Sequence, residues 1–491
     1  MNHAIRSQAA LKQRLLHPKL YHCQFWPKIR SFSSNVVNGS LGESEDADAI
    51  NPYDIAIVGG GMVGMALTCS LANKPLTKHL RVAIVDGNPS FGAKYSINKE
   101  DPPDSRVSTV TPSTIQHFKD VGAWSYVEQH RHAYFSTMQV WDYTDLGCTK
   151  YDAKDVNQDA LGCVVENKVL LSSLWSRIEE TGFKLSIHQA KLSSLKVHES
   201  TSPITDYHPS TEALFSNGRL AKLELTNGDT LYSKLVIGAD GGNSLVRDLA
   251  KFNTTGWSYS QNAVICTVSH SEANTCAWQR FLPSGPIALL PIGDNFSNIV
   301  WTMSPQEASE STQIDPTLFV NNVNSAFTKQ FSSNGSFSIS QIPSVPKVLT
   351  LVSPRMTFPL SLKHATNYAL HRVVLAGDAA HTVHPLAGQG VNLGFEDAFA
   401  LSKAVAGAVA VGSDIGDVRI LKEYEAERKP ANMMMMGILD GFQKAYAADF
   451  GPLNIVRGAA FNAANWIAPL KRTIISYASG TRKVQPFLPW S

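Results

Sequence analysis

The sequence has little cysteine and no long apolar run, and both shortages exclude classes of protein. Its six cysteines are scattered without a C-x-x-C pair, so neither a zinc ribbon nor a redox dithiol is predicted. No eighteen consecutive residues are apolar, so no membrane-spanning helix is predicted. Charged residues make up 17% and hydrophobic residues 43%, as in an ordinary globular protein. The 491 residues are enough for two or three domains.

Acidic residues are missing from the first 42 positions, which are rich in Ser and Leu. The basic residues there are Arg6, Lys12, Arg14, Lys19, Lys28 and Arg30. This composition is typical of a mitochondrial transit peptide, and a chloroplast signal or a disordered basic tail are the alternatives. Beyond this segment 37 of the 43 basic residues remain against 41 acidic ones, so no nucleic-acid partner is predicted.

The densest stretch of chemical signals is LAGDAAHTVHPLAGQGVNLG, residues 375–394. The apolar run Val373–Leu375 predicts a short buried strand, and Asp378 follows its carboxyl end. The next loop carries His381 and His384. Their H-x-x-H spacing suggests a metal, but no cysteine or third ligand is near, so no metal site is predicted.

The same loop ends in glycines immediately before an Ala/Leu-rich segment. Gly388, Gln389 and Gly390 precede a helix that we expect to begin near Val391. Such a junction lets free N–H groups and the positive helix end approach a flat or anionic group. Alone, this pattern also fits a strand, a turn and a core helix of any α/β protein, so a second motif must decide.

A second glycine motif begins the folded part of the chain. The apolar run Ile55–Val58 meets Gly59, Gly61 and Gly64 in G-x-G-x-x-G spacing, and a helical pattern follows. The three glycines provide a tight turn, close approach to a pyrophosphate, and close packing of helix on strand. Asp86 ends a second buried run, where its carboxylate can accept hydrogen bonds from ribose hydroxyls. These features predict a dinucleotide site.

A third motif, GADGGNS, lies between the other two. A buried strand at Leu235–Ile237 delivers Asp240 and Gly241 into a turn, and a helix carrying Arg247 follows. A nicotinamide enzyme needs no further nucleotide-handling strand near residue 375, whereas bound FAD needs contacts for its ribityl chain and ring. The combination therefore predicts FAD.

In this order and at these separations, the three motifs resemble those of class A flavoprotein monooxygenases, which hydroxylate phenols. The resemblance covers residues 53–480 and is strongest to the ubiquinone-biosynthesis hydroxylase branch, in particular its mitochondrial form. The stretches that carry this narrower resemblance are DSRVSTVTPSTI, LGCVVENKVLLSSL, QRFLPSGPIALLPI and ERKPANMMMM.

The resemblance implies a set of FAD-binding residues. They are Gly59, Gly61, Gly64, Asp86, Arg106, Asp240, Gly241, Asp378, Gly388, Gln389, Gly390 and Asn392. Arg106 would lie across the flavin phosphate and ribityl region, although it can also be a surface partner of Asp104. Asp240 can also cap the next helix. No catalytic acid or base is assigned, but His381 or His384 could steady a flavin hydroperoxide or relay a proton.

The expected fold is α/β, with a Rossmann-like FAD domain of the p-hydroxybenzoate-hydroxylase type, a mostly antiparallel substrate sheet and C-terminal helices. The expected ranges are 1–50 for the transit peptide and linker, 51–115, 160–256 and 365–435 for the FAD domain, 116–159 and 257–364 for the substrate sheet, and 436–491 for the C-terminal helices. Within these, 198–217 is predicted to be a surface insertion, and the four methionines 433–436 to fill a helix core.

The resemblance implies an FAD-dependent hydroxylase in ubiquinone biosynthesis that uses O2 on a polyprenylated 4-hydroxybenzoate-type phenol. It implies electrons from a ferredoxin and its reductase, other ubiquinone-biosynthesis proteins as partners, and a peripheral position on the matrix side of the mitochondrial inner membrane. The C-terminal region either covers the core or rests on a membrane. The alternatives are an NADPH-dependent hydroxylase of a soluble phenol and a non-catalytic prenyl-binding escort.

Overall fold

Apolar runs of four residues or fewer, each ending in Gly or Asp, build the first sheet of the protein. The computed structural model describes residues 51–89, 91–92, 97–98, 100–144, 148–199, 210–329, 344–385, 388–447, 463 and 467–480. All of these belong to one unit, Ala49–Ser491. The expected transit peptide and half of the expected insertion, residues 200–209 of 198–217, lie outside the described residues.

The first sheet is mainly parallel. Its parallel strands lie in the order β19 (Val373–Leu375), β11 (Thr230–Gly238), β1 (Tyr53–Val58), β2 (Val82–Val85) and β8 (Leu185–His188). Three further strands of this sheet pair in antiparallel fashion. They are β18 (Ala369–Leu370), β9 (Leu192–Val197) and β10 (Ala221–Leu225). The central strands are buried on both faces, as continuous Val/Ile runs require. The predicted strands at 55–58, 235–237 and 373–375 are confirmed.

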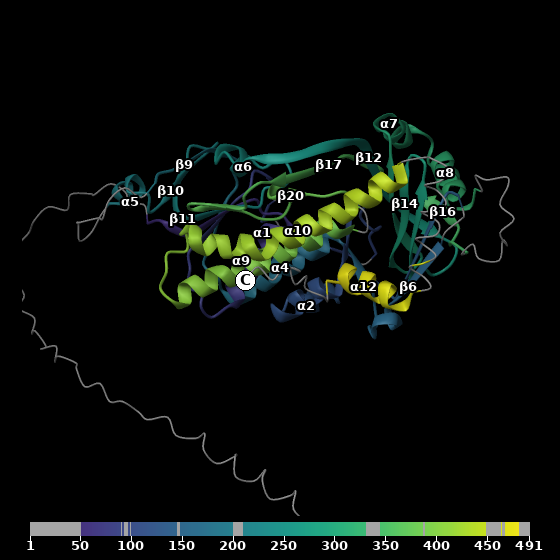
Figure 1. Ribbon diagram of the computed structural model, residues 1–491, viewed down its shortest axis with the longest axis horizontal. Coiled ribbons are helices and arrows are strands. Elements are labelled where there is room, and N and C mark those ends of the chain that lie inside the picture. Colours follow the sequence, from purple (N-terminus) through teal and green to yellow (C-terminus); the bar gives the residue numbers. More distant parts are fainter. Residues whose placement is uncertain are drawn as a thin grey trace, which may run out of the picture. The chain divides into compact units, whose positions relative to one another are not determined.

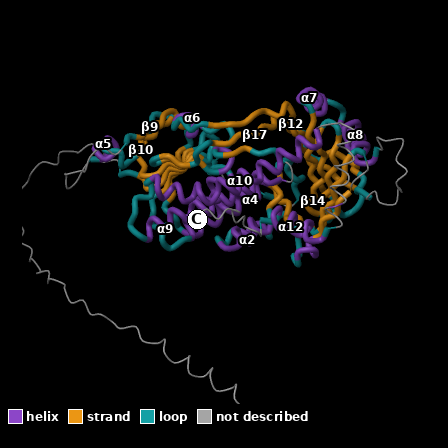
Figure 2. Tube along the Cα trace, in the orientation of Figure 1, coloured by secondary structure: helices purple, strands orange, loops and turns teal. Residues whose placement is uncertain are grey.

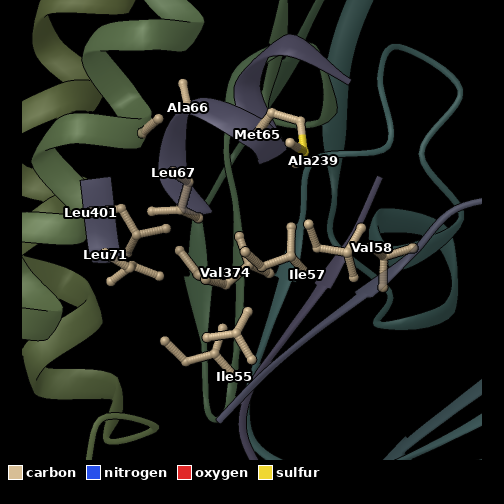
Figure 3. Close-up of a cluster of buried hydrophobic side chains, with 14 of the residues drawn as sticks. Ile55, Ile57, Val58, Met65, Ala66, Leu67, Leu71, Ala239, Val374 and Leu401 are labelled. Atoms are coloured by element: carbon tan, nitrogen blue, oxygen red, sulfur yellow. The ribbon is translucent and has the colours of Figure 1, made fainter. Parts of the chain in front are cut away.

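Helices cover this parallel sheet. They are α1 (Met62–Asn73), α4 (Asn167–Thr181), α9 (Gln389–Ala410) and α10 (Val418–Ala447). α1 packs between α4 and α9, and α9 packs against α10, as Figure 1 shows. Leu67 and Leu71 of α1 and Leu401 of α9 meet Ile55 and Val374 of the sheet in a fully buried core (Figure 3).

The second sheet has nine strands and is mostly antiparallel, which confirms the expected fold class. Its strands are β20 (His381–Thr382), β17 (Met356–Ala365), β12 (Thr254–His270), β15 (Phe296–Met303), β14 (Gly285–Gly293), β13 (Cys276–Leu282), β5 (Thr137–Asp142) and β6 (Cys148–Asp152), with β16 (Val348–Leu351) beside β12. One pair, β5 with β13, is parallel. Figure 2 shows several strands of this sheet gathered near the β14 label.

The two faces of the large sheet have different neighbours. Alternate residues such as Val264 and Ile299 pack under α8 (Pro316–Thr328), against Phe319 and Val323. A short helix, α7 (Pro305–Gln313), contributes Ala308 to the same core. These two helices were not predicted, because their sequences are polar and lie within a range read as strands. The opposite face points toward the parallel-sheet unit.

A small sheet joins the two larger ones. It consists of β3 (Val107–Val110), β7 (Gly162–Glu166) and β4 (His132–Phe135), next to α2 (Pro112–Asp120) and α3 (Trp124–Val127). Part of the expected substrate range, 116–159, therefore lies outside the nine-stranded sheet, which takes only β5 and β6 from it.

The C-terminal helices contact the sheet units. The expected boundary at residue 435/436 falls inside α10, which continues through Pro430. Met435 and Met436 are buried, but Met433 and Met434 are 52% and 44% exposed. The prediction that all four methionines fill a core is therefore wrong for two of them, since four consecutive helical residues point in different directions. The last described helix is α12 (Ala468–Ala478).

Candidate active site

The three sequence motifs lie at one edge of the parallel sheet because the strands before them end in register. Val58 pairs with Gly238, and Gly238 pairs with Leu375. The chain continues the ladder beyond the strand ends, where Ala239 N donates to Val58 O at 2.8 Å and Ala376 N donates to Gly238 O at 2.9 Å. Ligands of α/β sheets bind at this carboxyl edge. The structure thus brings together turns that are separated by more than 300 residues.

The glycines of the first turn differ in what surrounds them. Gly59 has φ +106°, and a Cβ there would lie 2.3 Å from Ala239 O. A Cβ on Gly64 would lie 2.0 Å from Gly59 O, so this glycine permits helix α1 to pack on the turn. At Gly61 nothing lies within 4 Å of the Cβ position. Gly61 therefore leaves open space at the start of α1, where a phosphate can approach the backbone.

The carboxylates of Asp86 and Asp240, which follow β2 and β11, accept hydrogen bonds from the protein backbone. Asp86, after β2, accepts hydrogen bonds from Gly60 N at 2.6 Å and Asn88 N at 2.8 Å. Asp240 accepts from Leu245 N at 2.7 Å, so it caps α6 (Leu245–Leu249). This cap is compatible with the predicted cofactor role of Asp240, and the neighbouring Gly241, at φ +81°, has open space at its Cβ position.

The third turn rests on a buried polar network centred on Asp397 of α9. One carboxylate oxygen of Asp397 accepts from Gly377 N at 3.0 Å and lies 2.5 Å from His381 Nε2. The other accepts from Arg428 Nε at 2.9 Å and Asn432 Nδ2 at 3.0 Å. Burial alone raises the pKa of Asp397, but His381 and Arg428 outweigh it and hold that pKa below its usual range.

Asp378 follows Gly377 and borders the cavity described below. Desolvation by the surrounding protein raises its pKa, His381 opposes this rise, and the Asp397 charge adds to it. A hydroxyl that donates to Asp378 would favour the ionised form and reverse the rise. The surroundings of Asp378 therefore suit a hydrogen-bond donor such as a ribityl hydroxyl.

The glycine loop before α9 is tied to two other parts of the chain. Asn392 donates to Gly388 O at 3.0 Å and to Thr109 O at 2.8 Å, and it accepts from Thr111 N at 3.0 Å. Its side chain holds the loop against β3. Gln389 Nε2 donates to Ala478 O at 3.3 Å, which joins the loop to the last turn of α12. The helix begins at Gln389, two residues before the expected start.

Arg106 is exposed, and its guanidinium bonds to no other described residue. The surface ion pair with Asp104 does not form through this side chain, because Asp104 Oδ1 accepts instead from the Arg106 backbone N at 2.9 Å. The segment is anchored by the buried carboxylate of Glu166, which accepts from Asp104 N at 2.9 Å and pairs with Arg131 and Lys168. The anchor leaves the Arg106 side chain free to meet an anion.

The two histidines of the loop have different partners. His381 is held by Asp397, whereas neither ring nitrogen of the buried His384 has a hydrogen-bond partner in the described part of the chain. Burial lowers the pKa of His384 to about 4, with Asp440 opposing the shift, so the imidazole is neutral near pH 7. In the described part of the chain, no three His, Cys, Asp or Glu side chains gather as metal ligands do.

A cavity of about 1120 Å³ lies between these turns and the large sheet. It adjoins the face of that sheet opposite the one that packs on α8. Of the predicted site residues, the following line it: Gly61, Arg106, Gly241, Asp378, His384, Gly388, Gln389 and Gly390. The predicted residues that do not line it are Gly59, Gly64, Asp86, Asp240, His381 and Asn392.

The remaining walls of the cavity were not predicted residue by residue. The sheet contributes mainly apolar side chains from β5, β12, β13, β14, β15 and β17. Met434, Met435 and Phe442 of α10 and Ile474 and Tyr477 of α12 close another side. Their only sequence signal was the alternation of apolar residues along the strands and the helical spacing near the C-terminus.

The comparisons with known proteins agree with this geometry. Residues 52–437 match the family model described as an FAD binding domain. The chain is 36% identical over 469 residues to the protein of Xenopus tropicalis named "Ubiquinone biosynthesis monooxygenase COQ6, mitochondrial", covering 90% of this chain and 97% of that protein. The human protein of the same name is 35% identical over 449 residues, with 87% and 92% covered.

The chain belongs to the COQ6 family of ubiquinone-biosynthesis monooxygenases. Like the other members of this COQ6 family it is an FAD-dependent monooxygenase. Two solved structures show the same fold at low identity. PqsL of P. aeruginosa has a TM-score of 0.64 at 20% identity, with 84% of this chain and 100% of that chain covered. The p-nitrophenol 4-monooxygenase PnpA of Pseudomonas putida has 0.64 at 15%, with 88% and 99% covered.

The residues present fit FAD. The open space beyond Gly61 and Gly241 admits a pyrophosphate, the free guanidinium of Arg106 can pair with it, and Asp378 can accept from the ribityl chain. The positive, N-terminal end of α9 borders the same cavity through Gly388, Gln389 and Gly390. None of the described helices combines the length and the apolar character that crossing a bilayer requires.

Proposed function

We propose that this monooxygenase hydroxylates the aromatic ring of a polyprenylated 4-hydroxybenzoate-type phenol in ubiquinone biosynthesis. The observation that carries the proposal is the shared cavity: its flavin-side turns and its apolar sheet enclose one space of about 1120 Å³. The apolar side chains of the sheet side, such as Val140 and Phe281, suit an apolar tail.

The predicted FAD contacts follow from the placement of the residues. Gly61 and Gly241 would receive the pyrophosphate, Arg106 would pair with it, and Asp86 would exchange its Gly60 contact for the adenosine ribose. Asp378 would hold the ribityl chain, and the N–H groups at Gly388–Gly390 would face the pyrimidine edge of the ring. When bound and reduced, FAD activates O2 and supplies the electrophilic oxygen atom.

The chain itself supplies positioning and exclusion of water. Side chains such as Val300, Leu290 and Phe281 on the sheet, with Met435 and Tyr477 on the C-terminal helices, form a dry enclosure around the ring. Such an enclosure prevents loss of the activated oxygen as hydrogen peroxide. We assign no catalytic acid or base, because the charges at the cavity wall, Arg106 and Asp378, both lie on the flavin side.

The source of electrons and the membrane contact are part of the same proposal. We infer delivery of electrons by a ferredoxin and its reductase, with NADPH upstream, and a peripheral position on the matrix side of the mitochondrial inner membrane among other ubiquinone-biosynthesis proteins. The membrane contact is supported by α12, where Ile467 and Leu470 are 50% and 42% exposed and Ile474 reaches the cavity. An apolar tail could pass from lipid to cavity along this side.

A reconstituted reaction tests the proposal. The FAD-loaded protein, a ferredoxin, its reductase and NADPH are mixed with 4-hydroxybenzoate carrying a short prenyl tail under ¹⁸O2. We expect one ¹⁸O atom in the product by mass spectrometry. Hydrogen peroxide formation without a labelled product would contradict the proposed substrate class, and a protein that purifies without a flavin spectrum would favour the prenyl-binding escort.

Two further experiments separate the alternatives. Rapid flavin reduction by NADPH alone would favour a direct NADPH-dependent hydroxylase of a soluble phenol. Lipid extracts of cells that lack the gene should accumulate a quinone precursor with one hydroxyl group too few. A normal quinone profile in those cells would overturn the assignment to ubiquinone biosynthesis.

A further inference from the structure

One row of side chains across the cavity face of the large sheet contains a single polar residue. The pairing register aligns Val140, Gln279, Ala288, Val300 and Ile265 in a row across five adjacent strands. All five line the cavity, and four of them are apolar. Gln279 of β13 therefore lies near the middle of the sheet wall with its amide directed to the cavity side.

The amide of Gln279 has no hydrogen-bond partner among the residues that the structure describes. The residue is 7% exposed, and its side chain makes no hydrogen bond to any described residue. Gln279 lines the cavity, so its amide is available to a bound group, whereas a Leu or Met would serve packing alone at this position. The neighbouring strand β5 carries another glutamine, Gln139, on the opposite face of the sheet. Its side chain donates to Cys148 Sγ at 2.6 Å.

The loop that follows Asp378 places a second unpartnered polar group across the cavity. His384 is 1% exposed, lines the cavity and has no partner at either ring nitrogen. Its ring meets the edge of Tyr259 at 5.1 Å. Val383, the residue before it, packs in the cluster that contains Val140 and Phe281, the neighbours of Gln279 across and along the sheet. The loop and the amide thus lie at one end of the cavity.

The chemistry of this end is neutral. Among the described residues that line the cavity, Arg106 and Asp378 carry the formal charges. Both lie on the flavin wall, the side of the cavity that the glycine and aspartate turns form. A glutamine amide both donates and accepts, and a neutral imidazole does the same. The group that satisfies such a pair is a hydroxyl, which also donates and accepts. A ring hydroxyl is the polar group that a phenolic substrate must present.

We propose that Gln279 and His384 form a subsite that binds the phenolic oxygen of the substrate ring and thereby sets which ring carbon faces the flavin. This inference rests on the proposed function, because it assumes a phenol in the cavity. The two residues fix the ring from opposite walls, while the apolar row on either side of Gln279 holds the ring faces. A site built to pair a hydroxyl rejects analogues that lack it.

The test measures selectivity for the hydroxyl on the FAD-loaded protein. The probes are 4-hydroxybenzoate with a short prenyl tail and its 4-methoxy analogue, and the dissociation constants are read from the change in the flavin spectrum. We expect the wild type to bind the phenol about tenfold more tightly than the methoxy compound, as one lost hydrogen-bond partner in a buried site implies. In Gln279→Leu the ratio should fall to about one, with FAD content unchanged.

Two variants complete the test. Gln139→Leu removes an amide from the opposite face of the same sheet and should keep the wild-type selectivity. His384→Phe keeps a ring at the loop and should lower the selectivity as Gln279→Leu does. A Gln279→Leu protein that keeps the tenfold preference, or that loses FAD with the preference intact, overturns the inference.

The outcomes distinguish this inference from the proposed function. If the wild type binds neither probe, the substrate class is wrong. If the wild type binds and hydroxylates the phenol but both cavity variants keep its selectivity and its product pattern, the function stands and the subsite does not. A shift in the position of hydroxylation in Gln279→Leu, measured by NMR of the product, would support the orienting role directly.

Discussion

The two long walls of the cavity are built on opposite principles. The flavin wall consists of turns that present backbone and the carboxylate of Asp378 to the cavity, and these turns are supported by buried hydrogen bonds such as those of Asp397. The sheet wall consists of side chains on a flat ladder that is supported by packing on α8. The first wall has little freedom to vary, whereas the second can change side chain by side chain.

The comparison teaches where cofactor and substrate are encoded. A turn that must approach a pyrophosphate needs glycine at fixed spacing, so it leaves a motif in the sequence. A sheet face that holds an apolar ring needs only alternation and correct volume. The predictions below break each wall in turn, from the largest expected effect to the smallest.

Removal of the charge at Asp397 should give the largest effect. Asp397→Ala leaves the Arg428 guanidinium and the Gly377 N–H without their buried acceptor, which costs about 3–5 kcal/mol. Because the pKa of Asp397 is held below its usual range in the fold, this stability is present above about pH 4 and is lost as the pH falls further. Denaturant unfolding at pH 7 and at about pH 3 measures both effects.

The exposed pair Lys403–Glu427, with 4.0 Å between its charged atoms, is the matched control. Glu427→Ala should cost less than about 1 kcal/mol at either pH. An Asp397→Ala protein as stable as this control would show that the flavin wall does not depend on its buried network.

The next prediction compares two glycines of one turn. Gly64→Ala puts a Cβ 2.0 Å from a backbone oxygen and should destabilise the protein by about 3 kcal/mol with or without FAD. Gly61→Ala meets nothing within 4 Å, so the apoprotein should keep its stability and lose affinity for FAD. Thermal unfolding of both apoproteins, with FAD titrations, measures the difference. Equal melting temperatures of the two variants would contradict the assigned roles.

Asp378→Ala should leave a folded protein that purifies largely without flavin. We expect FAD to bind about 100-fold more weakly, since a charge-assisted hydrogen bond contributes roughly 1.5–3 kcal/mol. Since desolvation raises the pKa of Asp378, acid should release FAD from the wild type at a higher pH than an ordinary aspartate would imply. Flavin fluorescence follows the release.

Asp120→Ala on the exposed end of α2 is the control and should leave FAD affinity and its pH profile unchanged. Full retention of FAD by Asp378→Ala would remove Asp378 from the cofactor site.

The parallel sheet and the flavin wall could be predicted because each strand ended at a glycine or an aspartate. Strand Val373–Leu375 lay where the apolar run placed it, and the three turns met at one edge as parallel strands require. The buried partner of His381 could not be predicted. Asp397 reads as an ordinary polar residue of a helix until α9 turns it inward.

The sheet wall escaped prediction for a different reason. Gln279 stands in the run CAWQRFL, where alternation marks a strand but not which face a cavity will adjoin. The closing of the cavity by α12 also could not be predicted, since the Gln389–Ala478 hydrogen bond joins residues 89 positions apart. Long-range packing decides such contacts, and local patterns do not record it.

The sheet wall is altered by Val300→Phe, which should leave FAD binding intact. The larger ring fills cavity space beside Gln279, so we expect KM for the prenylated phenol to rise about tenfold, as one badly fitting group in a hydrophobic pocket does. More hydrogen peroxide should form per NADPH consumed. Leu349→Phe, at an exposed position of β16, is the control. A Val300→Phe protein that loses FAD instead would show that the two walls are not separable.

The smallest effect is expected where the sheet wall meets the surface. Leu470→Ser on α12 removes an exposed apolar side chain from the proposed membrane-facing side while the helix stays tied to the sheet unit through Lys471–Asp155, at 2.8 Å. Each buried leucine contributes roughly 1.5–3 kcal/mol when fully desolvated, so partial insertion should weaken vesicle binding only about two- to fivefold. Sedimentation with liposomes of phosphatidylcholine and cardiolipin measures the binding.

The control is Leu318→Ser on α8, at 51% exposure and on the far face of the large sheet, and this variant should bind as the wild type does. Equal binding by both variants would show that the lipid contact lies elsewhere. In that case α12 would only close the cavity as part of the protein core.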